Sequence, residues 1–95
     1  MIVRVLEEGQ YEIDDANAEV VERLDTVLGD ALRSGDEDTF SATLAAVLAE
    51  VRSTGRRVED TTIVPSDLAL PHPGATLAEV QALLADDAES AIDRR

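Results

Sequence analysis

The sequence predicts a single small α+β domain, and three observations point to that fold class. A β-branched N-terminal segment with a turn signal indicates a strand pair over residues 1–14. Two runs with apolar residues at helical spacing indicate an antiparallel helical hairpin from about Ala16 to Arg52. A capping motif before a third apolar stripe indicates a short C-terminal helix. We therefore expect a small N-terminal antiparallel sheet packed on a helical hairpin and a short C-terminal helix.

The predicted strand pair has an apolar leading strand over residues 1–6. Glu8-Gly9 fits a two-residue turn, and Tyr11 and Ile13 then alternate with polar neighbours. A strand with two apolar faces is usually covered on both sides. Helices can cover one face, and the other can meet a partner or a second copy of the chain. The two faces carry Val3 and Val5 on one side, and Ile2 and Leu6 on the other.

The helical hairpin is predicted from two apolar stripes and the hinge between them. Asp14 or Asp15 is expected to cap the first helix. Gly35 can take the left-handed conformation that ends it, and Asp36 can accept amide hydrogen bonds at the start of the second helix. The first stripe comprises Val20, Val21, Leu24, Val27, Leu28, Ala31 and Leu32, and the second comprises Phe40, Leu44, Val47, Leu48 and Val51.

Small residues occur inside both predicted helices. Gly29 costs the first helix about 1 kcal/mol relative to Ala, and we expect it to allow close packing against a neighbouring element. The second helix, over about residues 37–53, carries four alanines that let another helix approach closely. These are Ala42, Ala45, Ala46 and Ala49.

The segment after the hairpin starts as a polar connector over residues 56–60 and then becomes β-branched. Thr61 to Val64 can form a short third strand beside the N-terminal pair, and Pro65 stops it. Leu68, Ala69 and Leu70 form a short apolar run before a Pro-rich loop.

The C-terminal helix is predicted from a capping box, in which Thr76 and Glu79 satisfy each other's backbone amides. Its apolar stripe fades near Asp86, so we assign residues 1–85 to the domain and residues 86–95 to an acidic, frayed tail.

The charge balance disfavours whole classes of partner. The formal net charge is −13, from 21 acidic residues against 8 basic ones. A nucleic-acid-binding surface needs a basic stripe to neutralise phosphates, so nucleic acid is not an expected partner. Anionic lipid is disfavoured for the same reason. An acidic surface instead favours encounter with a basic protein surface.

No cysteine is present, so disulfides, thiolate nucleophiles and Cys-based metal sites are excluded. The N-terminus has no apolar signal-peptide core, and the apolar runs are shorter than the ~20 residues that a membrane span needs. We expect a cytoplasmic protein without direct membrane insertion.

No residue pattern in the sequence indicates catalysis. A small enzyme or ligand-binding protein would require Tyr11, Ser66, Asp67 and His72 to converge on one pocket. The acidic clusters lack the alternating spacing and glycine of a calcium loop, and they lie where helix ends favour carboxylates. We therefore predict no catalytic residue, no metal ligand and no cofactor.

Two segments that flank the hairpin resemble the PspA-associated protein family, PspAA. They are residues 1–13, MIVRVLEEGQYEI, and residues 64–71, VPSDLALP. Between and after them, Leu24-Asp25, residues 34–37 (SGDE) and residues 76–80 (TLAEV) fit the family's hairpin and last helix, so the resemblance extends to about Leu84.

This resemblance implies a small accessory protein associated with phage-shock protein A, a membrane-remodelling coiled-coil protein of envelope stress. It implies no enzymatic activity. We therefore expect a non-enzymatic adaptor that binds a PspA-like coiled coil. The expected partner contacts are Val3, Val5, Tyr11, Leu68 and Leu70.

The alternative readings are a self-associating structural module, in which a strand edge pairs with a second copy to give a homodimer, and the small ligand-binding protein or enzyme considered above.

Overall fold

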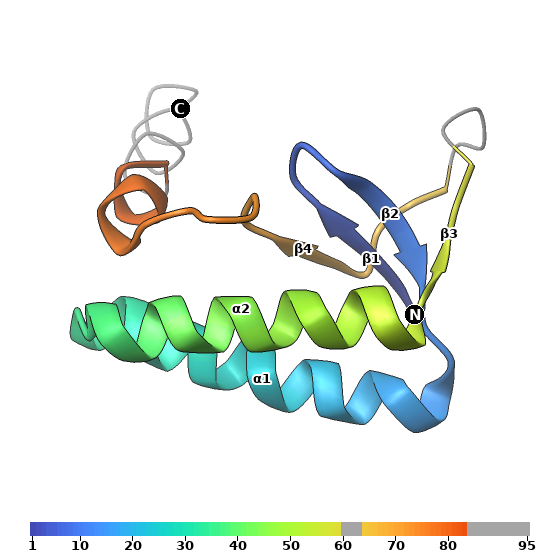
Figure 1. The fold of residues 1–95 in the computed structure, drawn as a ribbon, viewed down its shortest axis with the longest axis horizontal. Helices are drawn as coiled ribbons and strands as arrows, with labels where there is room; N and C mark the ends of the chain where they lie inside the picture. Colours follow the sequence, from blue (N-terminus) through green and yellow to red (C-terminus); the bar gives the residue numbers. More distant parts are fainter. Residues whose placement is uncertain (60–63, 84–95) are drawn as a thin grey trace, which may run out of the picture.

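The fold is a four-stranded sheet beside a pair of long helices (Figure 1). The computed structural model describes residues 1–59 and 64–83. Residues 77–83 are helical and follow the last strand. The predicted fold class, α+β with a sheet, a helical hairpin and a short C-terminal helix, is confirmed. The elements are β1 (Ile2–Val5), β2 (Gly9–Glu12), α1 (Asp15–Ser34), α2 (Glu37–Thr54), β3 (Arg56–Arg57) and β4 (Leu68–Leu70).

The sheet is mixed, with strand order β3-β2-β1-β4. β2 is antiparallel to β1 and to β3, and Val3 lies opposite Tyr11. β4 is parallel to β1, with Leu68 opposite Val3 on its other side. β3 and β4 are the two edge strands. Ahead of β4, Val64 lies beside Gln10, whose Nε2 donates to the Val64 carbonyl oxygen at 3.0 Å. The antiparallel order expected for the whole sheet therefore holds only for β1, β2 and β3.

A strand that we did not predict precedes the segment expected to form the third strand. Residues 61–63 of the predicted strand lie outside the described part of the chain, and Val64 is not in a strand. The segment expected to be a polar connector instead contributes β3, where Arg57 pairs with Tyr11 and Arg56 pairs with Glu12. Arg56 and Arg57 are both exposed, so this strand lacks the alternation of apolar and polar residues by which a strand is recognised in a sequence.

The turn between β1 and β2 has three residues, 6–8, rather than the predicted pair Glu8-Gly9. The Glu8 amide donates to the Val5 carbonyl oxygen at 3.0 Å, and Glu7 has a positive φ of 68°. Gly9 lies in β2, opposite Val5. Its φ of 133° favours glycine, and a Cβ there would come within 2.6 Å of the Arg57 guanidinium, so that side chain would have to shift.

The hinge between the helices has the predicted chemistry. Gly35 has a φ of 77°, and its amide donates to the Ala31 carbonyl oxygen at 2.9 Å. The Asp36 carboxylate accepts the Thr39 amide at 3.1 Å and so caps α2. The prediction for Gly29 is wrong, because the nearest atoms to an added Cβ belong to Arg33 of the same helix.

The core is almost entirely aliphatic, with Phe40 fully buried at its centre. The capping box at the C-terminal helix is confirmed: the Glu79 amide donates to Thr76 Oγ1 at 3.1 Å, and the Thr76 amide donates to Glu79 Oε1 at 3.2 Å. Leu77 of that helix is buried. The largest fully buried side chains besides Phe40 are Ile13, Leu70, Val3, Val5, Val21, Val47 and Val51.

Candidate functional site

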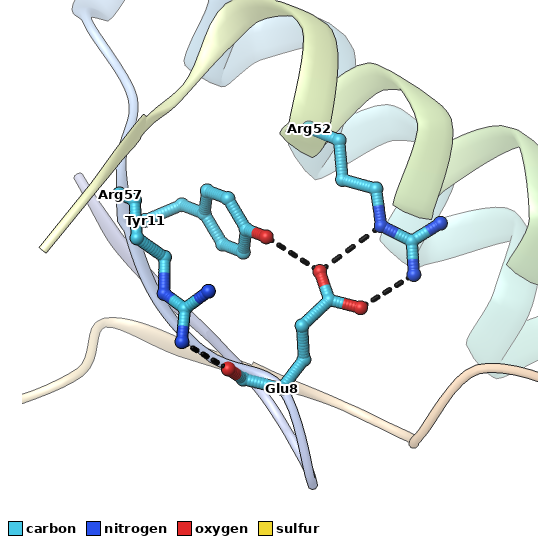
Figure 2. Close-up of polar contacts among 4 residues, drawn as sticks. All are labelled: Glu8, Tyr11, Arg52 and Arg57. Carbon is cyan, nitrogen blue, oxygen red and sulfur yellow. Dashed lines mark hydrogen bonds and ion pairs between the residues drawn. The ribbon is translucent and has the colours of Figure 1, made fainter. Parts of the chain in front are cut away.

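A polar cluster joins the β1–β2 turn to the C-terminal end of α2, and Figure 2 shows its four residues. The Glu8 carboxylate accepts the Arg52 Nε at 3.0 Å through Oε2, while the Arg52 Nη2 donates to Oε1. The Tyr11 hydroxyl donates to the same Oε2 at 2.5 Å. We call Glu8, Tyr11, Arg52 and Arg57 the Glu8 cluster.

Arg57 completes the Glu8 cluster from β3. Its Nη2 donates to the Glu8 backbone carbonyl oxygen, and its guanidinium carbon lies 5.7 Å from the centroid of the Tyr11 ring. That distance is within the range of a cation–π interaction. The cluster therefore links the turn, the adjacent edge strand and α2.

The electrostatics of the cluster fix its protonation state. The Arg52 guanidinium, followed by the Tyr11 hydroxyl, lowers the pKa of Glu8 from 4.5 to about 2. The hydrogen bond to Glu8, with burial, raises the pKa of Tyr11 above its usual value of 10.0. At neutral pH the carboxylate is thus charged and the phenol is neutral. A carboxylate held in this way is a poor proton acceptor, so the arrangement is suited to fixing the structure.

A second polar contact joins the same turn to the C-terminal helix. The His72 Nδ1 lies 3.5 Å from a Glu7 carboxylate oxygen, and its Nε2 lies 3.6 Å from a Glu79 carboxylate oxygen. Both carboxylates are more exposed than the imidazole. Among residues 1–59 and 64–83, no group of three or more His, Asp or Glu side chains could hold a metal ion.

The four residues required by the enzyme alternative have separate partners. Tyr11 belongs to the Glu8 cluster on the helix-facing side of the sheet. Ser66 accepts a hydrogen bond from Gln10 on the opposite side, at 2.7 Å, and Asp67 accepts the Ile2 amide at 2.8 Å. His72 lies between the two glutamates. The structure does not bring these four side chains into one site.

The residues expected to contact a partner are buried or partly buried in the structure. Val3 is 0% exposed, and Val5 and Leu70 are each 1% exposed. Tyr11 is 9% exposed, and Leu68 is partly buried against the core. Val3, Val5 and Leu70 therefore have almost no surface in the folded domain that a partner could contact. The alternation of β1 is compatible with either face pointing inward, and here Val3 and Val5 point towards the helices.

The exposed surface carries charge and scattered apolar groups. The large apolar side chains that are exposed are Leu6, Val20, Val27 and Leu83. The four alanines of α2, which we expected to let another helix approach closely, are exposed and lie on the solvent-facing side of that helix. Within the described residues, no helix is long and apolar enough to cross a membrane.

Sequence reasoning missed the Glu8 cluster. Glu8 and Arg52 are 44 residues apart, and neither belongs to a local motif. The sequence signal at Glu8 was its position before Gly9, which indicates a turn near this residue. That signal does not indicate that Arg52 would be its partner.

The fold is that of a small acidic α+β domain. In it, the Glu8 cluster and the contacts of His72 connect the β1–β2 turn to α2 and to the C-terminal helix. A family model described as PspA-Associated protein matches residues 1–93, so the chain belongs to that family. The match extends beyond Leu84 into the acidic tail, further than the resemblance seen in the sequence. No curated protein and no solved structure matches the chain.

Proposed function

We propose that this protein is a non-enzymatic cytoplasmic adaptor that binds a PspA-like coiled coil in an envelope stress response of the phage-shock type. The observation that carries the proposal is the family match over residues 1–93, because the family is described by its association with PspA. The Glu8 cluster is consistent with the non-enzymatic part of the proposal, since its polar groups are paired with one another rather than directed into a pocket.

The charge of the protein supports a basic surface as the partner. The net charge is −13, and exposed carboxylates lie along α1 and in the first turn of α2. Such a surface raises the rate of encounter with a basic partner, and the effect weakens as salt screens it. The exposed acidic residues of the helices include Asp15, Glu19, Glu22, Asp30, Glu37 and Asp38.

A pull-down of purified PspA coiled coil by the immobilised protein tests the proposal. We expect retention at low salt and reduced retention as the salt concentration rises. The matched control is Phe40→Asp, which keeps the acidic composition but places a carboxylate in a fully buried position. Loss of retention in this variant supports recognition by the folded domain. Equal retention by the variant, or none by the wild type, would overturn the proposal.

A further inference from the structure

A groove of about 190 Å³ lies between α1 and the β4 end of the sheet. Asp25, Leu28, Gly29 and Leu32 of α1 line one side, and Pro71 and Val80 lie among the residues opposite. Sites for drug-sized ligands are typically about 300 Å³ or larger. The groove is therefore matched to a single long side chain, and its lining is mostly apolar.

Asp25 gives this groove a charge that the fold leaves unneutralised. Its side chain is partly buried, and burial raises the pKa of the carboxyl above its usual value of 3.8. No hydrogen bond or ion pair joins the side chain to another residue in the described part of the chain. A carboxylate held partly out of water without a partner is unfavourable. A cation placed in the groove would relieve that cost.

Gly29 is a second, independent feature of the same groove. A glycine inside a helix costs about 1 kcal/mol relative to Ala, and no neighbouring element requires it, because an added Cβ would come near only the Arg33 side chain. Its φ is not positive, so the backbone conformation does not require it either. Gly29 lines the groove with Asp25, and its missing Cβ leaves room for the Arg33 side chain, whose Nη1 lies 3.4 Å from where that Cβ would stand.

We propose that this groove receives one arginine or lysine side chain from the partner coiled coil. The aliphatic stem of that side chain lies against Leu28, Leu32 and Pro71, and its charged end pairs with Asp25. Long basic side chains commonly combine an apolar stem contact with an exposed charge, and they occur at the flanking positions of coiled coils. The net charge of −13 favours the same partner. This inference rests on the proposed function and names its contact surface.

Titration of the PspA coiled coil into three variants of the full chain tests the groove. Asp25→Asn removes the charge with little change of shape, and we expect at least a tenfold loss of affinity. Glu22→Gln removes the same charge from an exposed site on the same helix, and we expect a change within twofold. Gly29→Ala adds a Cβ that meets only the flexible Arg33 side chain, so we expect a higher melting temperature and a change of affinity within twofold. Equal effects of Asp25→Asn and Glu22→Gln would overturn the assignment.

A second probe separates failure of the groove from failure of the proposed function. If the wild type does not bind the coiled coil, the proposed function fails, and the groove is tested with N-acetyl-arginine amide by amide chemical shifts. Shifts confined to residues 25–32 and abolished by Asp25→Asn support a site for a basic side chain. No shift, or the same shift in that variant, overturns it. Shifts of these amides with protein concentration alone would assign the groove to a second copy and contradict the proposal.

Discussion

The Arg52 guanidinium holds both oxygens of the Glu8 carboxylate and so joins the last turns of α2 to the β1–β2 turn. The Glu8 side chain is only 19% exposed, whereas the Arg52 side chain is 45% exposed. The pair is thus more protected than the pair between Glu19 and Arg23 on α1, whose side chains are both more than 70% exposed. Protected, bidentate pairs contribute more to stability than exposed ones.

Glu8→Gln should therefore destabilise the protein. It removes a charge-assisted pair and weakens the hydrogen bond from Tyr11, so we expect a loss of about 1–2 kcal/mol in the free energy of unfolding. Glu19→Gln breaks the exposed pair and should cost less than about 0.5 kcal/mol. Urea unfolding followed by circular dichroism measures both variants, and equal losses would show that Glu8 is not a special contact.

The contribution of Glu8 should disappear in acid. Its pKa falls from 4.5 to about 2 on folding, so the stabilisation is fully present above pH 4.5 and is lost as the pH falls towards about 2. Burial of Asp25 acts in the opposite direction, because its pKa is raised. The difference in stability between wild type and Glu8→Gln isolates the contribution of Glu8. That difference should shrink between pH 5 and pH 2, and a constant difference would contradict the account.

The Tyr11 hydroxyl should contribute at neutral pH and not in strong alkali. Its pKa is raised on folding, so its stabilisation is present below pH 10.0 and is lost as the pH rises through the folded-state pKa. Tyr11→Phe should cost about 1 kcal/mol at pH 7. Unfolding of the variant and the wild type should become more similar above pH 10. A cost that stays the same in alkali would contradict the assignment of the stabilisation to the hydrogen bond between the neutral hydroxyl and Glu8.

Two glycines at helix ends should respond differently to alanine. Gly55 has a negative φ, but an added Cβ would lie 2.5 Å from both Ile13 Cδ1 and the Val51 carbonyl oxygen. Gly55→Ala should cost about 1–3 kcal/mol because the core side chain and the backbone must shift. Gly35 has open space around it and a φ of 77°, so Gly35→Ala should cost only about 1 kcal/mol of backbone strain. Thermal unfolding that ranks the two the other way would contradict this distinction.

The helical part of the fold was predictable because its signals are local. The stripes of α1 and α2, the left-handed Gly35 and the cap at Asp36 each depend on residues within a few positions of one another. The capping box of Thr76 and Glu79 is local in the same way.

The sheet was harder to predict because its contacts span the chain. β4 pairs with β1 in parallel, with Leu68 opposite Val3, although the two strands are far apart in the sequence. The sequence also left open which face of β1 points inward. Val3 and Val5 face the helices, and this choice buried most of the residues expected to contact a partner. The groove beside Asp25 needs α1, β4 and the C-terminal helix together.

The central claim, that this acidic domain binds a coiled coil of the PspA type, is tested most directly by calorimetric titration of the purified PspA coiled coil into the wild-type protein. The account predicts saturable binding at low salt that weakens strongly at about 1 M salt, where the Debye length is about 3 Å. The absence of any binding at low salt would contradict it.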